Sequence, residues 1–396
     1  MLAVGTSEQL IGWSRFWRLG CRRTDYLFDA GTTRPSLLDK FPHLSSIPNA
    51  QNDNAQNGNA QNDKAQDNNA QDNNARNKMD PTQNAGEQAS SKRQLVSSWR
   101  EDEILSVFKQ TPKCKANGNS VTGFVFPVKH PIVYVKFCFP PARGMAEVKN
   151  HDYAFRALKA MPPNQTQGIF IPEIYRTFQN DDRVFIVMDY IDGKTLRQLQ
   201  EQQDWDSKKE TFINDIARAI QLLMSIQPPP GQKPGPVGGG HIRHPLFKDD
   251  SAFGEYSSVE ELEKHLNKVS TIRDKAAPTV SLEKDLCFYY SDLFPGNFMF
   301  TAAGNLYVID FDQAGFLPLS FMSFALAESR WSPGLWIKDI LRLPEHNLDA
   351  MKNIFYWFAI GVSWLGELAS HFCPISLVAN FTFGLKGHPR PERRRY

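Results

Sequence analysis

The sequence has few cysteines, no long hydrophobic run and no excess of charge, and each of these absences excludes a class of protein. Five cysteines are dispersed over 396 residues without a Cys-x-x-Cys pair, which is typical of reduced thiols inside the cell rather than of a disulfide framework. No secretory signal is visible, and the apolar stretch 354–365 is too short to span a bilayer, so we expect a core helix there and a cytoplasmic protein with no membrane partner. A formal net charge of +2 lacks the basic excess typical of nucleic-acid-binding proteins.

Repeats of five residues rich in Asn, Ala and Gln run from residue 49 to residue 77. They contain almost nothing apolar larger than alanine, so they cannot bury enough surface to offset the entropy of ordering. We therefore predict a disordered linker over residues 49–93, with aggregation through the Asn/Gln tract as an alternative. Residues 1–48 give no clear element pattern, and the basic residues of 389–396 are predicted to form a solvated tail.

Between the linker and the tail, the pattern of apolar residues predicts a sheet-rich unit over 94–191 and a mainly helical unit over 192–388. Ser98 and Glu101 have capping-box spacing, which predicts that a helix begins there. The other predicted helices are 147–159, 212–226 and 258–269, and the predicted strands are 121–128, 132–139, 183–190, 286–290, 298–300 and 306–309. The fold class is therefore α+β with two lobes.

Chemistry-bearing residues concentrate in one stretch of the second unit. Asp292 ends an apolar strand, Asn297 follows it in a Pro-Gly-containing loop, and Asp310 ends the last strand of the hairpin that comes next. Phosphoryl transfer needs a carboxylate to orient the attacking hydroxyl and oxygen ligands to hold magnesium against the phosphates. The alternative is a surface hairpin in which these residues only form turns.

Asp-Leu-Phe-Pro-Gly-Asn at 292–297 and Ile-Asp-Phe-Asp-Gln-Ala-Gly at 309–315 resemble the catalytic core of the aminoglycoside phosphotransferase and choline kinase group. The resemblance extends from about residue 113 to about residue 326 and implies a bilobal protein-kinase-like fold that uses ATP and Mg²⁺. It implies that Asp292 is the catalytic carboxylate and that Asn297 and Asp310 bind the metal. Tyr290 departs from the family pattern, which has histidine at this position.

The same resemblance assigns upstream residues to the nucleotide. Lys136, on an apolar strand, would bind phosphate, although an edge-strand lysine facing solvent is the alternative. Glu147 is the candidate partner of Lys136, with His151 and Asp152 near the same register. Met188 and Tyr190 resemble the hinge whose backbone bonds adenine, and residues 117–120 resemble a phosphate-covering loop.

The implied function is ATP-dependent phosphorylation of a hydroxyl group on a small molecule, since the helical unit lacks the Ala-Pro-Glu signature of protein kinases. The alternative is a catalytically silent kinase-like module that binds nucleotide or a partner, suggested by Tyr290 and the glycine-poor loop. Residues 228–250 lie where the family carries its substrate-shaping insertion, so His241, Arg243 and His244 are candidates for substrate contact. A metal site at His241 and His244 lacks the further ligands that zinc requires.

Overall fold

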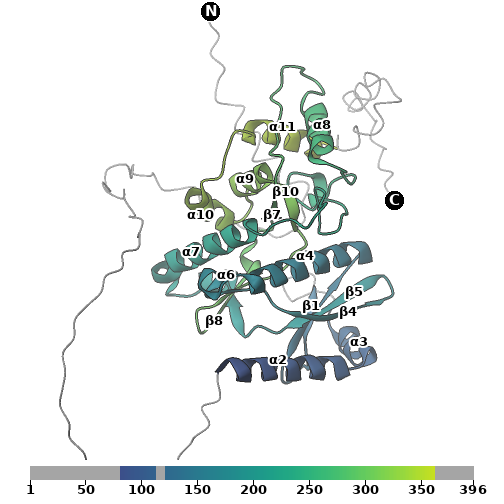
Figure 1. Ribbon diagram of the computed structural model, residues 1–396, viewed down its shortest axis with the longest axis vertical. Coiled ribbons are helices and arrows are strands. Elements are labelled where there is room, and N and C mark those ends of the chain that lie inside the picture. The colour runs from purple at the N-terminus through teal and green to yellow at the C-terminus, as the bar shows by residue number, and fades with distance from the viewer. Residues whose placement is uncertain (1–80, 113–120, 362–396) are drawn as a thin grey trace, which may run out of the picture. The chain divides into compact units, whose positions relative to one another are not determined.

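The computed structural model describes residues 81–112 and 121–361, which form a sheet-rich lobe and a mainly helical lobe (Figure 1). None of the helices within these ranges is both long and apolar enough to cross a membrane. The predictions for residues 1–80, for the loop at 117–120 and for the tail at 389–396 lie outside the described residues.

The first lobe is built on a four-stranded antiparallel sheet with strand order β1-β2-β5-β4. Its elements are α2 (Pro81–Ser98), α3 (Glu101–Gln110), β1 (Gly123–Phe126), β2 (Val133–Cys138), α4 (Pro141–Ala160), β4 (Ile174–Asn180) and β5 (Arg183–Asp189). Figure 1 shows α2 and α3 on one side of this sheet and α4 on the other.

Strand β2 places its side chains alternately on the two faces of the sheet, as a strand must. Val133 and Val135 pack with residues of α2 and α3, whereas Tyr134 and Cys138 pack with Val148 of α4. Lys136 shares the parity of Tyr134 and Cys138, so β2 directs its ammonium group toward α4.

The predicted start of structure in this lobe is wrong in two respects. Helix α2 begins at Pro81, so residues 81–93 are helical rather than linker. The Ser98 hydroxyl donates to the Leu95 carbonyl at the end of α2, and α3 begins only at Glu101, where Glu103 accepts from the backbone N–H of Arg100. The capping spacing thus predicts the start of α3 two residues too early, because the end of one helix adjoins the start of the next.

The second lobe contains two small sheets, with strand orders β3-β9-β8-β6 and β10-β7. Its elements, with those that lead into it, are α5 (Pro163–Thr166), β3 (Ile169–Phe170), β6 (Gly193–Thr195), α6 (Leu196–Gln200), α7 (Trp205–Met224), η2 (Lys248–Asp250), α8 (Val259–Ser270), β7 (Leu286–Tyr290), η3 (Pro295–Asn297), β8 (Phe298–Thr301), β9 (Leu306–Val308), β10 (Ala314–Pro318), α9 (Leu319–Ala327), α10 (Ser332–Leu341) and α11 (Leu348–Ala359).

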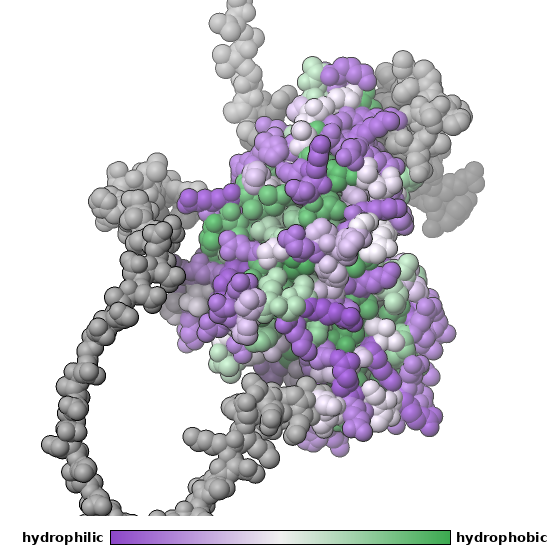
Figure 2. Space-filling model, in the orientation of Figure 1, coloured by the Kyte–Doolittle hydropathy of each residue, from purple (hydrophilic) through white to green (hydrophobic). Residues whose placement is uncertain are grey.

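A large apolar core fixes the strands of this lobe. Fully buried aromatic side chains from β7, β8 and β10 meet there, including Phe288, Phe298 and Phe316. Burial of such rings is the main favourable contribution to folding, at about 1.5–3 kcal/mol for each side chain. On the face seen in Figure 2, the larger hydrophobic area also lies over the helical lobe.

Most predicted elements are present. Strand β7 has the predicted bounds, the hairpin of β8 and β9 is confirmed, and the apolar stretch from residue 354 lies partly in the core helix α11. Helix α4 begins six residues earlier than predicted, at Pro141, which extends the helix that carries Glu147. Strands β3, β4, β6 and β10 were not predicted.

Candidate active site

Lys136 is the centre of an ion network between the two lobes. Its Nζ lies 2.6 Å from Glu147 Oε1 on α4 and 2.8 Å from Asp310 Oδ1, which follows β9. The side chains of Lys136 and Glu147 are 13% and 3% exposed, so the pair is shielded from water. The lysine therefore faces the interior rather than solvent, and one cation joins the sheet, α4 and the second lobe.

The other two candidates for the partner of Lys136 have different roles. His151 is buried and one ring nitrogen lies 2.6 Å from the Pro172 carbonyl, while Asp152 pairs with Arg156 one turn along α4. Burial lowers the pKa of His151 to about 4, so it remains neutral. Glu147 alone of the three reaches Lys136.

The charges of this network follow from a competition between burial and pairing. Burial opposes the charge on Lys136, but Asp310 and Glu147 outweigh it and raise the pKa of Lys136 well above its usual value. For Asp310, burial is likewise outweighed by Lys136, and its pKa is lowered. Burial raises the pKa of Glu147 to about 7, against the opposing effect of Lys136. Lys136 and Asp310 are thus held charged.

The loop after β7 brings Asp292 and Asn297 together. The Asn297 side chain donates from Nδ2 to the backbone carbonyl of Asp292 at 3.0 Å, and Asn297 is 5% exposed. A hydrogen bond from the backbone N–H of Ile309 to the Asn297 carbonyl, 3.0 Å long, ties this loop to the residue before Asp310. Asp310 has a φ of 66°, a left-handed conformation that turns the chain sharply at the end of the hairpin. Asn297 and Asp310, thirteen positions apart in the sequence, are therefore brought close together in the structure.

Asp292 binds its proton more tightly than an aspartate usually does. Burial raises its pKa to about 6, and the nearby negative charge of Asp310 acts in the same direction. A carboxyl group with a pKa near neutrality in a polar cluster is a candidate for catalysis.

Tyr290 connects the two chain segments that carry these carboxylates. The residue is 1% exposed, and its hydroxyl donates to the Ile309 carbonyl at 2.5 Å. Burial raises the pKa of Tyr290 well above its usual value, so the hydroxyl remains a donor. The tyrosine thus joins the end of β7 to the residue that precedes Asp310, and its presence in place of histidine does not leave the loop unsupported.

We expect Tyr290→Phe to lower the free energy of unfolding by about 1–3 kcal/mol, because it leaves the Ile309 carbonyl without its donor. Denaturant unfolding measures this loss. Tyr289→Phe is the matched control, since Tyr289 is also fully buried but its hydroxyl donates to the Arg243 carbonyl instead. If the Tyr290 hydroxyl holds together the segments that carry Asp292 and Asp310, only Tyr290→Phe should also weaken the nucleotide binding that the family resemblance implies, and equal binding by the two variants would contradict this role.

Three residues that sequence reasoning did not assign reinforce the position of α4. Arg143 makes two hydrogen bonds to Asp312, of 2.6 and 2.5 Å, and Asn150 donates to the carbonyls of Phe311 and Ala314 at 3.3 and 2.8 Å. These contacts hold α4, and with it Glu147, against the segment that begins with Asp310. Asp312, two positions after Asp310, was the one feature of the sequence that could have indicated this contact. Its partner, Arg143, could be identified only from the structure.

The predicted hinge joins the sheets of the two lobes. Met188 lies within β5 and is 6% exposed, and Tyr190 follows the strand before β6 begins at Gly193. The N–H groups of Asp189 and Tyr190 donate to the carbonyls of Glu173 and Ile132 at 3.0 and 3.3 Å. Those two donors are engaged within the first lobe.

The insertion at 228–250 contributes one buried histidine and one arginine that approaches the site. His244 is completely buried, and its two ring nitrogens contact the Phe321 carbonyl and the Leu246 N–H, so it is a core residue and not a substrate contact. Arg243 contacts Asp312 at 3.3 Å. His241 is exposed and contacts the Ala252 carbonyl.

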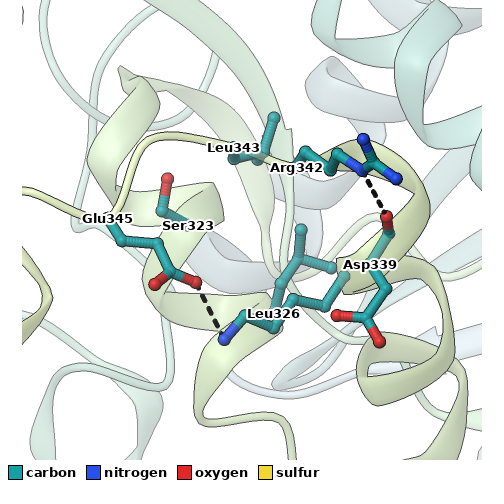
Figure 3. A pocket seen from close by; sticks show the side chains of 7 residues that line it. Ser323, Leu326, Asp339, Arg342, Leu343 and Glu345 are labelled. Carbon is teal, nitrogen blue, oxygen red and sulfur yellow. Dashed lines mark hydrogen bonds and ion pairs between the residues drawn. The ribbon is translucent and has the colours of Figure 1, made fainter. Parts of the chain in front are cut away.

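A separate hollow of about 390 Å³ lies between α9 and the end of α10 (Figure 3). Its lining includes Lys338, which pairs with Glu345 at 2.9 Å, and Arg342, which donates to the Asp339 carbonyl at 3.2 Å. None of the candidate site residues lines it.

Comparison with known proteins agrees with the fold. The sequence profile of the phosphotransferase enzyme family matches residues 135–346, more than half of the chain. A search of curated proteins found no significant match.

Three solved structures illustrate the likeness. Aminoglycoside phosphotransferase APH(4)-Ia is 13% identical, with a TM-score of 0.35 over 63% of this chain and 81% of that chain. A putative fructosamine-3-kinase from Haemophilus somnus 129PT is 12% identical, with a TM-score of 0.34 over 59% and 78%. Aminoglycoside-3'-phosphotransferase of type VIII is 13% identical, with a TM-score of 0.36 over 65% and 98%. Such distant likenesses carry no argument about the substrate.

The two lobes, their α+β content and the family match together confirm the predicted bilobal, protein-kinase-like fold. The chain belongs to the phosphotransferase enzyme family.

Proposed function

We propose that this protein transfers the γ-phosphoryl group of ATP to a hydroxyl group of a small molecule. The observation that carries the proposal is the position of Lys136, whose Nζ contacts both Glu147 and Asp310 across the two lobes. A phosphate-binding lysine needs a buried partner that holds its side chain and a nearby metal-binding carboxylate, and Glu147 and Asp310 supply these.

In this proposal, Asp292 orients the acceptor hydroxyl and accepts its proton. The hydroxyl oxygen forms a bond to the γ-phosphorus while the bond from that phosphorus to the β,γ-bridging oxygen breaks, and ADP leaves with the electron pair of the broken bond. Lys136 neutralises phosphate charge, and Glu147 positions Lys136. The hinge that contains Met188 and Tyr190 borders the adenine site, whose backbone donors would come from beyond Tyr190 because the N–H of Tyr190 is already engaged.

The residues present fit a magnesium ion. Asn297 and Asp310 offer an amide and a carboxylate oxygen, and magnesium in phosphotransferases is held by one or two protein ligands together with phosphates and water. Within the described residues no group of three or more His, Cys, Asp or Glu side chains is suited to a metal ion. When bound, magnesium would supply charge neutralisation for the phosphates.

Activity should rise with pH through the pKa of Asp292, which is about 6. The ionised carboxylate accepts the proton, so the reaction is slow below that pH, increases about tenfold for each pH unit at first, and levels off above pH 7. A profile of kcat against pH measures this. A rate that is independent of pH between 5 and 7.5, in a chemistry-limited reaction, contradicts the role of Asp292.

Thermal unfolding with nucleotide tests the proposed function directly. ATP with Mg²⁺ should raise the midpoint, since a ligand at 100 times its Kd stabilises the folded state by about 2.7 kcal/mol. AMP with Mg²⁺ is the control, because it lacks the β- and γ-phosphates of ATP. A midpoint unmoved by ATP and Mg²⁺ contradicts the proposal.

A further inference from the structure

The segment between α9 and α10 lies against the loop that carries Asp292. A Cβ on Gly334 would come within 2.3 Å of the Ser329 Oγ and 2.8 Å of the Leu293 Cδ1, so only glycine permits this close approach. The rings of Trp331 and Phe294 meet edge to face, with centroids 4.7 Å apart. Arg330 and Trp331 are therefore held next to the catalytic loop.

The insertion reaches Arg330 through Asp250, the last residue of η2. Arg330 Nη2 lies 2.9 Å from one carboxylate oxygen of Asp250 and 3.2 Å from the other. The side chains of Arg330 and Asp250 are 49% and 26% exposed, so a solute reaches both. Both charges also act on the pKa of Asp292: Asp250 raises it and Arg330 lowers it, although burial, Asp310 and Asn297 have larger effects.

The acidic groups around Asp292 are balanced by cations. Asp250 pairs with Arg330, Asp312 contacts both Arg143 and Arg243, and Asp310 contacts Lys136. A polycationic acceptor binds where unpaired carboxylates accumulate, and an anionic one binds where guanidinium groups lack partners. Each of these three carboxylates has a cationic partner and each of the cations has an acidic one, although the Nε of Arg243 has no hydrogen-bond partner.

We propose that Asp250, Arg330 and Trp331 form the acceptor-recognition site of this protein and that the acceptor is an uncharged polyhydroxylated ring, such as a neutral sugar or cyclitol. The inference rests on the proposed function and specifies the substrate class of the same site.

The chemistry of the three side chains matches such a ring. The Asp250 carboxylate accepts hydrogen bonds from hydroxyl groups, and the planar guanidinium of Arg330 donates to hydroxyl oxygens from a fixed fork. Trp331 is 39% exposed and offers an apolar surface for the C–H face of the ring. A neutral ring uses both members of the ion pair without displacing either. One of its hydroxyl groups then loses its proton to Asp292 as its oxygen takes the phosphoryl group and ADP departs.

The test measures ADP release by the full-length protein with Mg²⁺·ATP and four acceptors: glucose, myo-inositol, glucosamine and glucuronate. We expect the wild type to use glucose or myo-inositol with the highest kcat/KM. Arg330→Gln leaves Asp250 unbalanced and should shift the ratio of kcat/KM for glucosamine over glucose upward by about tenfold. Asp250→Asn leaves Arg330 unbalanced and should shift the ratio for glucuronate over glucose upward by a similar factor.

The control pair is Arg156→Gln and Asp152→Asn, which alter an Arg–Asp pair on the outer surface of α4 and should leave every ratio unchanged. An exposed pair contributes only about 0–1 kcal/mol to folding, so all four variants should fold. If ATP binds with Mg²⁺ and only the charged acceptors are phosphorylated, or none is, the inference is wrong while nucleotide binding stands. If Mg²⁺·ATP does not bind at all, the proposed function falls as well.

Discussion

Replacing Asp292 with asparagine should lower kcat by about 10²–10⁴-fold, because the amide cannot accept the proton of the acceptor hydroxyl. Asparagine has the same shape, so the loop and its contact with Asn297 should be retained. Phosphoryl transfer from ATP, measured beside the wild type at saturating acceptor, gives the ratio. Equal rates would favour a catalytically silent binding module over an enzyme.

The same variant should be more stable than the wild type at pH 8. The folded-state pKa of Asp292, about 6, lies above its ordinary value of 3.8, so the folded protein binds this proton more tightly than the unfolded chain does. The stability that this tighter proton binding adds is fully present below the ordinary pKa and is lost as pH rises through 6. At high pH the ionised carboxylate therefore lowers the free energy of unfolding by at most about 3 kcal/mol. Asp292→Asn removes the charge and should restore part of this free energy of unfolding. Loss of activity together with raised stability distinguishes a catalytic role from damage to the fold.

Replacing Lys136 with methionine should lower the free energy of unfolding by about 3–5 kcal/mol and abolish ATP binding, because removing one member of a buried pair leaves its partner unpaired. Glu147, 3% exposed, then loses the ammonium group that opposes the effect of burial on its pKa. The pKa of Glu147 should rise further, so the variant should be least stable at high pH. Denaturant unfolding at pH 6 and pH 8 measures the difference.

Lys136→Met combined with Glu147→Gln is the control for that result. The second change removes the buried charge, so the double variant should be more stable at pH 8 than Lys136→Met alone, while nucleotide binding remains lost. If the second change adds a further loss of the same size as the first, Lys136 and Glu147 are not coupled in one ion network.

The sequence was sufficient to predict the strands and the hairpin between residues 286 and 310 because this part of the structure is local. Strand β7, the loop with Pro and Gly, and the hairpin of β8 and β9 each carry their own signal, and chain connectivity brings their ends together. Within that stretch, the Asn297 side chain contacts the backbone carbonyl of Asp292, and the backbone of Asn297 contacts that of Ile309, the residue before Asp310. The metal and catalytic roles of these residues remain predictions.

Contacts between distant segments were harder to predict. Nothing in the local pattern shows that Arg143 lies against Asp312, 169 positions later, or that Asn150 reaches the carbonyl of Ala314. The choice of Glu147 over His151 and Asp152 also depended on which face of α4 meets the sheet. Helix α2 gave little signal because its segment 81–98 is largely polar, and part of its stabilisation comes from the burial of Val96 against the first-lobe sheet.

Titration of ATP into the protein with and without Mg²⁺ tests most directly whether the oxygens of Asn297 and Asp310 converge on one metal ion. For the wild type, Mg²⁺ should tighten ATP binding, whereas Asp310→Ala should bind ATP equally in both conditions. Asp312→Ala, which removes a neighbouring carboxylate engaged by Arg143, should retain a Mg²⁺ effect. Binding by Asp310→Ala that Mg²⁺ strengthens as much as in the wild type would contradict the proposed metal site.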